Sequence, residues 1–275
     1  MDSLAVVILN YKTWQDTLSE AKEIADNCGV CWSDIVIVDN CSQNDSVEGL
    51  NANKFWGYVL IENKNNMGYA AGNNIGLRYA YRKGYKYAWI VNNDVLIKDK
   101  EIISKILQIF SKDENIAAVS PDIYAPSGHM FNRDCTCPSF FDLTVGMLKY
   151  SKKGRKMANH GGFGYVYRPQ GCCMFLDLDK MADVDYMDEA TFLYSEEIIL
   201  AERLCRKGYK CACCCDSYVI HNHSKTVKSV FDKKRIRKMQ VNSFAYYLKK
   251  YRGYGRLKNK IGCWFYTVKL ILLGG

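Results

Sequence analysis

Residues 89–95 read Trp-Ile-Val-Asn-Asn-Asp-Val, and the organisation of the chain can be worked out from this stretch. An apolar run that begins at Tyr87 predicts a short buried strand, which ends on Asn92, Asn93 and Asp94. In an open α/β sheet, ligands bind outside the carboxyl ends of the strands, so these three side chains are expected to line a cleft. The carboxylate of Asp94 suits Mg²⁺ or Mn²⁺, although the same residues also suit a turn.

Three earlier apolar runs predict strands of the same kind. They occupy residues 4–9, 35–38 and 58–61, and their β-branched character is typical of parallel strands that are covered on both faces. Helices are expected between the strands, beginning with residues 14–28, for which Thr13 is the expected N-terminal cap. This alternation predicts a doubly wound, mainly parallel sheet of the α/β class.

The turn after the first strand lacks the glycine pattern of dinucleotide-binding proteins. It reads Asn-Tyr-Lys-Thr-Trp from Asn10 onward, so it provides no close approach of a pyrophosphate to the backbone. A nicotinamide or flavin oxidoreductase is therefore disfavoured. Asp39, at the end of the second strand, can instead accept hydrogen bonds from a base or a ribose. The same position suits a turn or a helix cap equally well.

The second half of the chain is patterned less regularly. Residues 121–167 are rich in glycine, proline, serine and aromatic residues, and we expect them to face the substrate. Residues 171–176 predict another buried strand. Residues 209–220 predict a further strand, which delivers His221 and His223 at its end. Because neighbouring side chains of an extended strand point to opposite sides, only one of these histidines can face the cleft.

Two adjacent carboxylates open a predicted helix at Glu196 and Glu197. A helix dipole favours carboxylates in the first turn, which is one explanation of this pair. The other is that one of the two acts as a general base at the mouth of the cleft. The sequence pattern alone leaves both explanations open.

These motifs belong to a larger set that occurs in a fixed order between residues 4 and 224. The set comprises residues 7–11, 38–42, 66–74, 92–95, 171–175 and 194–197, followed by Arg203 and His221. In this order they resemble the family 2 glycosyltransferases of the GT-A fold. The resemblance is greatest to those that build bacterial capsular, O-antigen and exopolysaccharide chains, including rhamnosyltransferase-like members.

The resemblance implies a Rossmann-like GT-A domain and a role for each matching residue. Glu197 would be the catalytic base, with Glu196 beside it, in place of the family's Glu-Asp pair. Asp94 would bind the metal, Mn²⁺ or Mg²⁺, as part of the family's Asp-x-Asp motif. Because Asn92 replaces the first acid of that motif, the metal would rely on Asp94, the donor diphosphate and His221. The donor would be bound by Asn10, Asp39, Asn66, Gly68, Asn73, Asn92, Asn93 and Asp94, with Asp39 at the base.

The implied reaction moves a sugar from a UDP- or dTDP-linked donor to a hydroxyl group, with inversion at the anomeric carbon. The acceptor would be a growing, lipid-linked cell-surface polysaccharide of a bacterium. A non-catalytic protein that binds sugar nucleotides or nucleic acid is the alternative, and release of nucleoside diphosphate would distinguish the two.

The composition is that of a soluble globular protein, with 48% hydrophobic and 24% charged residues. The first apolar run is too short for a signal peptide. Thirteen cysteines, several of them adjacent, suit reduced thiols better than disulfides. We therefore expect a cytoplasmic protein.

The net charge of +9 is concentrated in one segment. Residues 225–260 contain 13 lysines and arginines and one acid, and an apolar stretch at 261–273 follows. About 20 apolar residues are needed to span a bilayer, so this stretch is too short. We expect a catalytic domain at 1–224 and a helical extension at 225–275 that holds the protein on the anionic inner face of the cell membrane. The alternative is that the extension packs on the sheet. Nucleic acid is not an expected partner, because the sequence contains no motif of a nucleic-acid-binding module.

Overall fold

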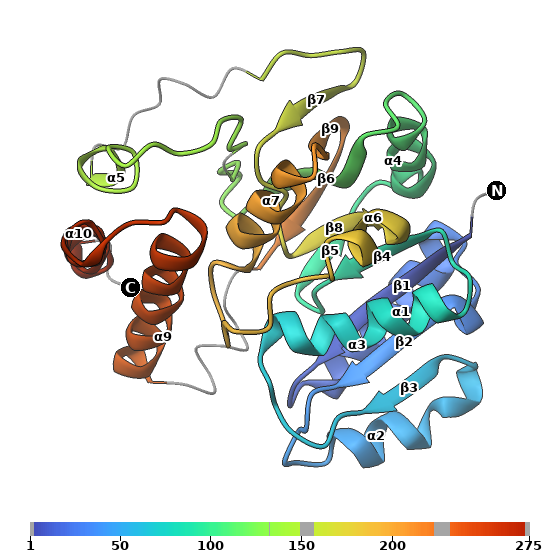
Figure 1. Cartoon of the computed structure of the whole chain (residues 1–275). Coiled ribbons are helices and arrows are strands. Elements are labelled where there is room, and N and C mark those ends of the chain that lie inside the picture. The colour runs from blue at the N-terminus through green and yellow to red at the C-terminus, as the bar shows by residue number, and fades with distance from the viewer. Residues whose placement is uncertain (1–2, 132, 149–156, 223–231, 273–275) are drawn as a thin grey trace.

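A computed structural model describes residues 3–131, 133–148, 157–222 and 232–272 (Figure 1). Its sheet has the strand order β3-β2-β1-β4-β8-β6-β9-β5, and β7 pairs with β9. The first four strands are parallel and connected by helices, as the sequence predicts. These elements are β1 (Leu4–Asn10), α1 (Trp14–Cys28), β2 (Ile35–Asp39), α2 (Ser46–Ala52), β3 (Val59–Glu62), α3 (Tyr69–Arg82) and β4 (Tyr87–Val91).

The remaining strands make the sheet mixed. The chain continues through β5 (Val95–Ile97), α4 (Ile102–Phe110), β6 (Ile116–Tyr124), α5 (Val145–Leu148), β7 (Phe163–Val166), β8 (Cys173–Asp177), α6 (Leu178–Asp183), α7 (Glu196–Arg206) and β9 (Lys210–His221). Strand β8 is antiparallel to β4 and to β6, whereas β6 and β9 are parallel. The α/β class and the GT-A type of mixed sheet are therefore confirmed.

Helices cover both faces of the sheet, because successive side chains of a buried strand point in opposite directions. On β1, Val6 and Ile8 pack with residues of α1, α2 and α4, whereas Ala5 and Val7 pack with residues of α3, α6 and α7. Helix α3 lies very close to β1: a Cβ added to Gly76 would be 2.4 Å from Cγ1 of Val7. The first strand therefore carries apolar side chains at consecutive positions and has no polar face.

The span 121–167 contains more regular structure than its composition predicts. Strand β6 continues past Ser120 to Tyr124, and β7 lies within the span. Pro121 does not end β6, because the pairing with β9 shifts register immediately after it and accommodates the missing N–H group. The composition gives no sign of such a shift.

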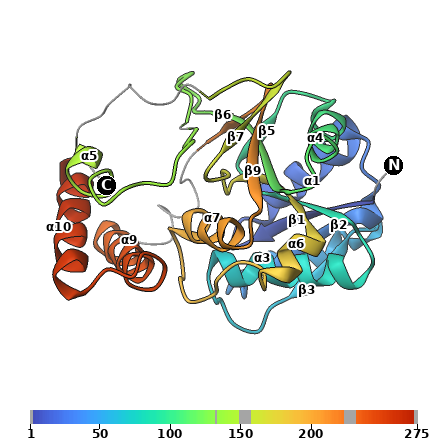
Figure 2. The ribbon, with the colours of Figure 1, turned by 45° about the horizontal axis from the view of Figure 1, so that its top comes forward.

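The C-terminal extension forms two packed helices, α9 (Lys233–Tyr246) and α10 (Arg256–Leu272), joined by a π-helical turn at Tyr247–Tyr251. Helix α9 lies between α7 and α10 (Figure 2). Phe244 stacks on Tyr266 with ring centroids 4.4 Å apart, and Leu248 fills the space above Gly262. His223 and residues 225–231 lie outside the described residues.

Helix α10 begins at Arg256, before the predicted start of the apolar stretch. Within the described ranges, none of the helices is long and apolar enough to cross a membrane. The division of the chain at residue 224 stays a prediction.

Candidate glycosyl-transfer site

The carboxyl ends of β1 and β2 bring Asn10 and Asp39 together. The two residues are opposite each other in the parallel register, and Nδ2 of Asn10 donates to Oδ1 of Asp39 over 2.7 Å. Oδ2 of Asp39 accepts from the backbone N–H of Ser42 at 2.9 Å, and Thr17 donates to Oδ1 of Asn10. These contacts fix the orientation of the Asp39 carboxylate, which is almost completely buried.

The loop before α3 is held by asparagines. Asn40 donates to Oδ1 of Asn66 at 3.0 Å and to the carbonyl of Gly68 at 3.1 Å. Gly68 has a φ of 93°, and a Cβ there would lie 2.0 Å from the carbonyl oxygen of Phe192, so only glycine fits. Asn73 is fully buried and donates to the carbonyl of Tyr69, within the first turn of α3.

The three polar residues after β4 point in different directions. Asn93 donates to the hydroxyls of Thr13 and Thr17, at 2.9 and 2.8 Å, and so is tied to α1. Thr13 makes no side-chain cap on α1, contrary to the prediction, because its hydroxyl serves Asn93 instead. Asn92 instead accepts from the hydroxyl of Tyr69 at 3.2 Å.

Asp94 and His221 meet although 127 residues separate them. Strand β5 pairs with the end of β9, with Val95 opposite His221, and Asn222 donates to the carbonyl of Asp94. Nε2 of His221 lies 3.1 Å from Oδ1 of Asp94, and both side chains are largely buried. The two predicted metal ligands are thus adjacent.

This spacing fits a divalent cation. Two neighbouring ligands, each about 2.1 Å from one octahedral ion, stand about 3 Å apart. Among the described residues, however, no group of three His, Cys, Asp or Glu side chains could hold a metal. Asp94 and His221 could therefore supply only part of a coordination shell, as expected from Asn92 in place of an acid.

Glu196 and Glu197 begin α7 in very different surroundings. Glu196 is buried, and burial together with the charge of Glu197 raises its pKa to about 8. Glu197 is partly exposed and lies against Gly171, where an added Cβ would be 2.7 Å from its Oε1. Tyr194 and Ser195, just before the pair, both have positive φ, a strained conformation that often marks functional sites.

The family is decided by comparison of the sequence. Residues 6–177 match the model described as glycosyl transferase family 2. The chain belongs to this family. The match ends within β8, so it covers the strand ends that carry Asn10, Asp39 and Asp94 but not α7 or His221.

Two curated glycosyltransferases are similar to this chain over two thirds of its length or more. The low-salt glycan biosynthesis hexosyltransferase Agl10 of Haloferax volcanii is 26% identical over 225 residues, which cover 81% of this chain and 68% of that protein. The galactofuranosyltransferase GlfT1 of Mycobacterium tuberculosis is 22% identical, over 68% of this chain and 60% of that protein.

A solved structure supports the same fold. The mannosyltransferase PcManGT from Pyrobaculum calidifontis, in complex with GDP-Man and Mn²⁺, superposes with a TM-score of 0.62 at 13% identity. The superposition covers 96% of this chain and 69% of that structure. At this identity the likeness concerns the fold alone.

Sequence reasoning missed a residue that connects the strand end near Asp94 with Gly171 in this candidate site. The hydroxyl of Tyr69 donates to the carbonyl of Gly171 at 2.7 Å and also reaches Asn92. Tyr69 thereby links the strand end beside Asp94 with the glycine that lies against Glu197. The only signal was its place after Gly68 in the matched stretch 66–74.

Sequence reasoning also missed the support of the loop that leads to Glu196. Asp188 accepts from the hydroxyls of Tyr246, at 2.8 Å, and Tyr251. Ser243 on α9 donates to the carbonyl of Leu193 at 2.8 Å. Helix α9 and the turn after it therefore hold the loop that delivers the two carboxyls, a role that no spacing in the sequence indicates.

Proposed function

We propose that this family 2 enzyme transfers a hexose from a nucleoside-diphosphate sugar, UDP- or dTDP-linked, to a hydroxyl group with inversion. The observation that carries the proposal is the connection from Asp94 through Asn92 and Tyr69 to Gly171 and Glu197. It supports a site with a metal-binding end and a carboxylate end. GDP-Man and Mn²⁺ in the neighbouring structure support a nucleotide sugar and a cation as ligands.

At the metal-binding end, Asp94 and His221 would hold Mn²⁺ or Mg²⁺ together with the donor diphosphate. A divalent cation supplies Lewis-acid stabilisation of a leaving diphosphate. Nε2 of His221 lies within hydrogen-bond distance of Asp94, and the cation would take the place of that hydrogen bond. The nucleoside would lie along Asn10, Asp39, Asn66, Gly68 and Asn73, with Asn92 and Asn93 securing the strand end.

At the carboxylate end, Glu197 would remove the proton from the acceptor hydroxyl. Burial and the neighbouring charge of Glu197 raise the pKa of Glu196 to about 8, which disfavours two adjacent negative charges at this end of the site. One base acting on one hydroxyl in a direct displacement inverts the anomeric carbon. Tyr69 would keep Gly171 in place and thus preserve the space that Glu197 occupies.

The acceptor is proposed to be a lipid-linked saccharide of a cell-surface polysaccharide, met at the inner face of the membrane. The outer face of α10 supports this, because five large apolar side chains are each 37% to 73% exposed there: Leu257, Ile261, Trp264, Ile271 and Leu272. The inner face of α10 packs on α9 and the turn after it. The apolar stretch therefore contributes to packing and also leaves an apolar surface exposed. Arg256, Lys258 and Lys260 flank that surface and would attract anionic lipids.

The test is release of nucleoside diphosphate from a panel of UDP- and dTDP-sugars, with and without Mn²⁺, in the presence of membrane lipid extracts. The proposal expects release from at least one donor, with dependence on the cation. Tight binding of a donor without any release would instead support the non-catalytic alternative, which the family membership disfavours.

A further inference from the structure

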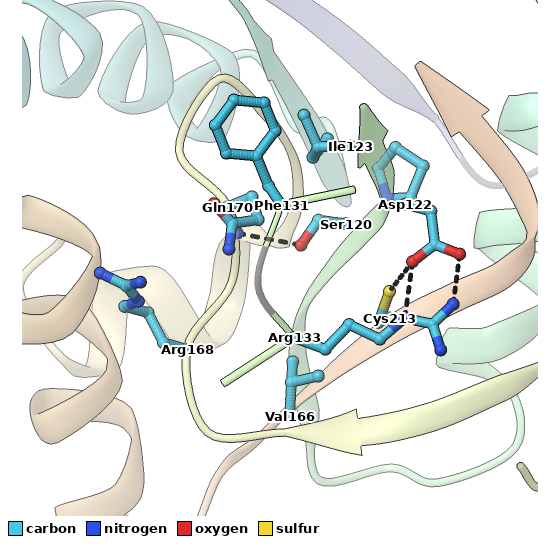
Figure 3. A pocket seen from close by; sticks show the side chains of 10 residues that line it. Ser120, Asp122, Ile123, Phe131, Arg133, Val166, Arg168, Gln170 and Cys213 are labelled. Atoms are coloured by element: carbon cyan, nitrogen blue, oxygen red, sulfur yellow. Dashed lines mark hydrogen bonds and ion pairs between the residues drawn. The ribbon is translucent and has the colours of Figure 1, made fainter. Parts of the chain in front are cut away.

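A small pocket beside the carboxylate end contains an arginine that is incompletely paired. The lining comprises Ser120, Pro121, Asp122, Ile123, Phe131, Arg133, Val166, Arg168, Gln170 and Cys213. Figure 3 shows Arg133 turned toward Asp122. Arg168 lies on the opposite side of the pocket, near Gln170. The lining therefore holds two guanidinium groups and one carboxylate.

The pocket lies between the two ends of the proposed site. Gln170 directly precedes Gly171, against which Glu197 packs. The backbone N–H of Gln170 donates to the hydroxyl of Ser120 at 3.0 Å. On the other side, the ring of Phe131 lies 6.3 Å from the ring of His221. A sugar that reacts beside Glu197 could therefore extend a substituent into the pocket.

The two arginines differ in how completely their guanidinium groups are paired. Arg133 makes a two-point ion pair with Asp122, which also accepts from the thiol of Cys213, so Arg133 is fixed. Arg168 pairs with Asp134 through one terminal nitrogen only. Its Nε is shut off from solvent and has no hydrogen-bond partner among the described residues, although 27% of the side chain is exposed.

Arg168 stays charged in this position. Burial lowers the pKa of Arg168, but Asp134 and Glu197 are close enough to raise it by more. An incompletely paired and partly exposed guanidinium binds oxyanions well, because its N–H groups donate charge-assisted hydrogen bonds to carboxylate oxygens.

We propose that Arg168 binds the carboxylate of a uronic-acid sugar unit whose reacting atom lies beside Glu197. The inference rests on the proposed transferase function and names a substrate class for it. The carboxylate could belong to the acceptor or to the donor sugar, since both meet at this point. The carboxylate of the sugar would accept the hydrogen bonds that Arg168 does not donate to Asp134.

The experiment measures binding by ligand-observed NMR and therefore does not depend on turnover. Methyl β-D-glucuronide and methyl β-D-glucoside are compared in the presence of UDP and Mn²⁺, and UDP-glucuronic acid is compared with UDP-glucose. We expect about tenfold tighter binding of the acid in one comparison, as for a charge-assisted hydrogen bond. A preference in the first comparison assigns the carboxylate to the acceptor, and one in the second assigns it to the donor. Equal binding in both overturns the proposal.

Two variants separate recognition from structure. Arg168→Gln should abolish the preference, whereas Asp134→Asn should keep or increase it, because the guanidinium then loses its competing carboxylate. If both variants lose the preference alike, Arg168 is a structural ion-pair residue and the proposal is wrong. Arg82→Gln, an exposed position on α3, controls for the loss of one positive charge and should leave the preference unchanged. Release of nucleoside diphosphate with no preference for acids would leave the transferase function intact while refuting this inference.

Discussion

Replacing Gly171 by alanine tests Glu197 as the base without removing any reacting group. The added Cβ would lie 2.7 Å from Oε1 of Glu197, whereas ordinary contact begins at 3.4 Å. The carboxylate must therefore move by at least 0.7 Å, which is 3.4 Å less 2.7 Å. Because misplacement of a reacting group by about 1 Å can cost 10²-fold, we expect kcat to fall by about 10- to 100-fold.

The cost in stability should be small, because the atoms that must move belong to the end of one flexible side chain. The assay is steady-state release of nucleoside diphosphate, with thermal unfolding measured in parallel. Gly255→Ala is the matched control, since an added Cβ there would meet nothing within 4 Å. A second substitution, Glu197→Asp, shortens the acid by one methylene and should recover part of the loss in the Gly171→Ala background. Unchanged kcat in Gly171→Ala, with an unchanged melting temperature, would refute the placement of the base.

Four further predictions concern the two carboxyls, the metal-binding end and α10. Glu197→Gln should lower kcat by about 10²–10⁴-fold with donor affinity preserved. Glu196→Gln should remain active, because burial and the charge of Glu197 already favour the neutral form of Glu196. The opposite result would exchange their roles. Since the pKa of Glu196 is about 8 in the folded protein against an ordinary 4.5, the folded state holds a proton that the unfolded chain releases. The free energy of unfolding should therefore fall as pH rises from 4.5 to 8, and Glu196→Gln should flatten this fall in urea titrations at several pH values. Asp94→Asn should abolish the Mn²⁺ dependence of donor binding without unfolding the protein, and calorimetry that finds it unaltered would exclude Asp94 as a ligand. Trp264→Ser with Leu272→Ser should weaken co-sedimentation with anionic vesicles at low salt, while Phe55→Ser, at a side chain 79% exposed on the other part of the molecule, should not.

The parallel half of the fold could be predicted because its determinants are local. The runs that become β1, β2 and β4 are continuous and apolar, and strands buried on both faces require that composition. The extension of β6 could not be predicted, because it depends on a register shift against a strand some 90 residues away. Thr13 failed as a cap for a similar reason, since its partner Asn93 comes from β4.

The candidate site residues that belong to sequence motifs were named from the sequence. Those whose role depends on tertiary contacts were missed. Asp94 and His221 were named from the resemblance, and only the pairing of β5 with β9 explains why they meet. Tyr69 and Arg168 were not singled out, because a tyrosine or an arginine in a loop is common. Their importance comes from what surrounds them: a carbonyl and an amide for Tyr69, and Asp134 and the proposed base Glu197 for Arg168.

The contacts on Asp188 give the two helices of the C-terminal extension different roles, which the predicted boundary at residue 224 does not indicate. Helix α9 and the turn after it supply Tyr246, Lys250 and Tyr251 to one carboxylate. A chain that ended at residue 224 would leave that carboxylate without these three partners and would uncover Ile199 on α7. Helix α10 instead packs on α9 through Tyr266 and Gly262, and large apolar side chains are exposed on its outer face. Substitutions on the outer face of α10 can therefore suit a different environment, whereas α9 must change together with the loop before Glu196 that it supports.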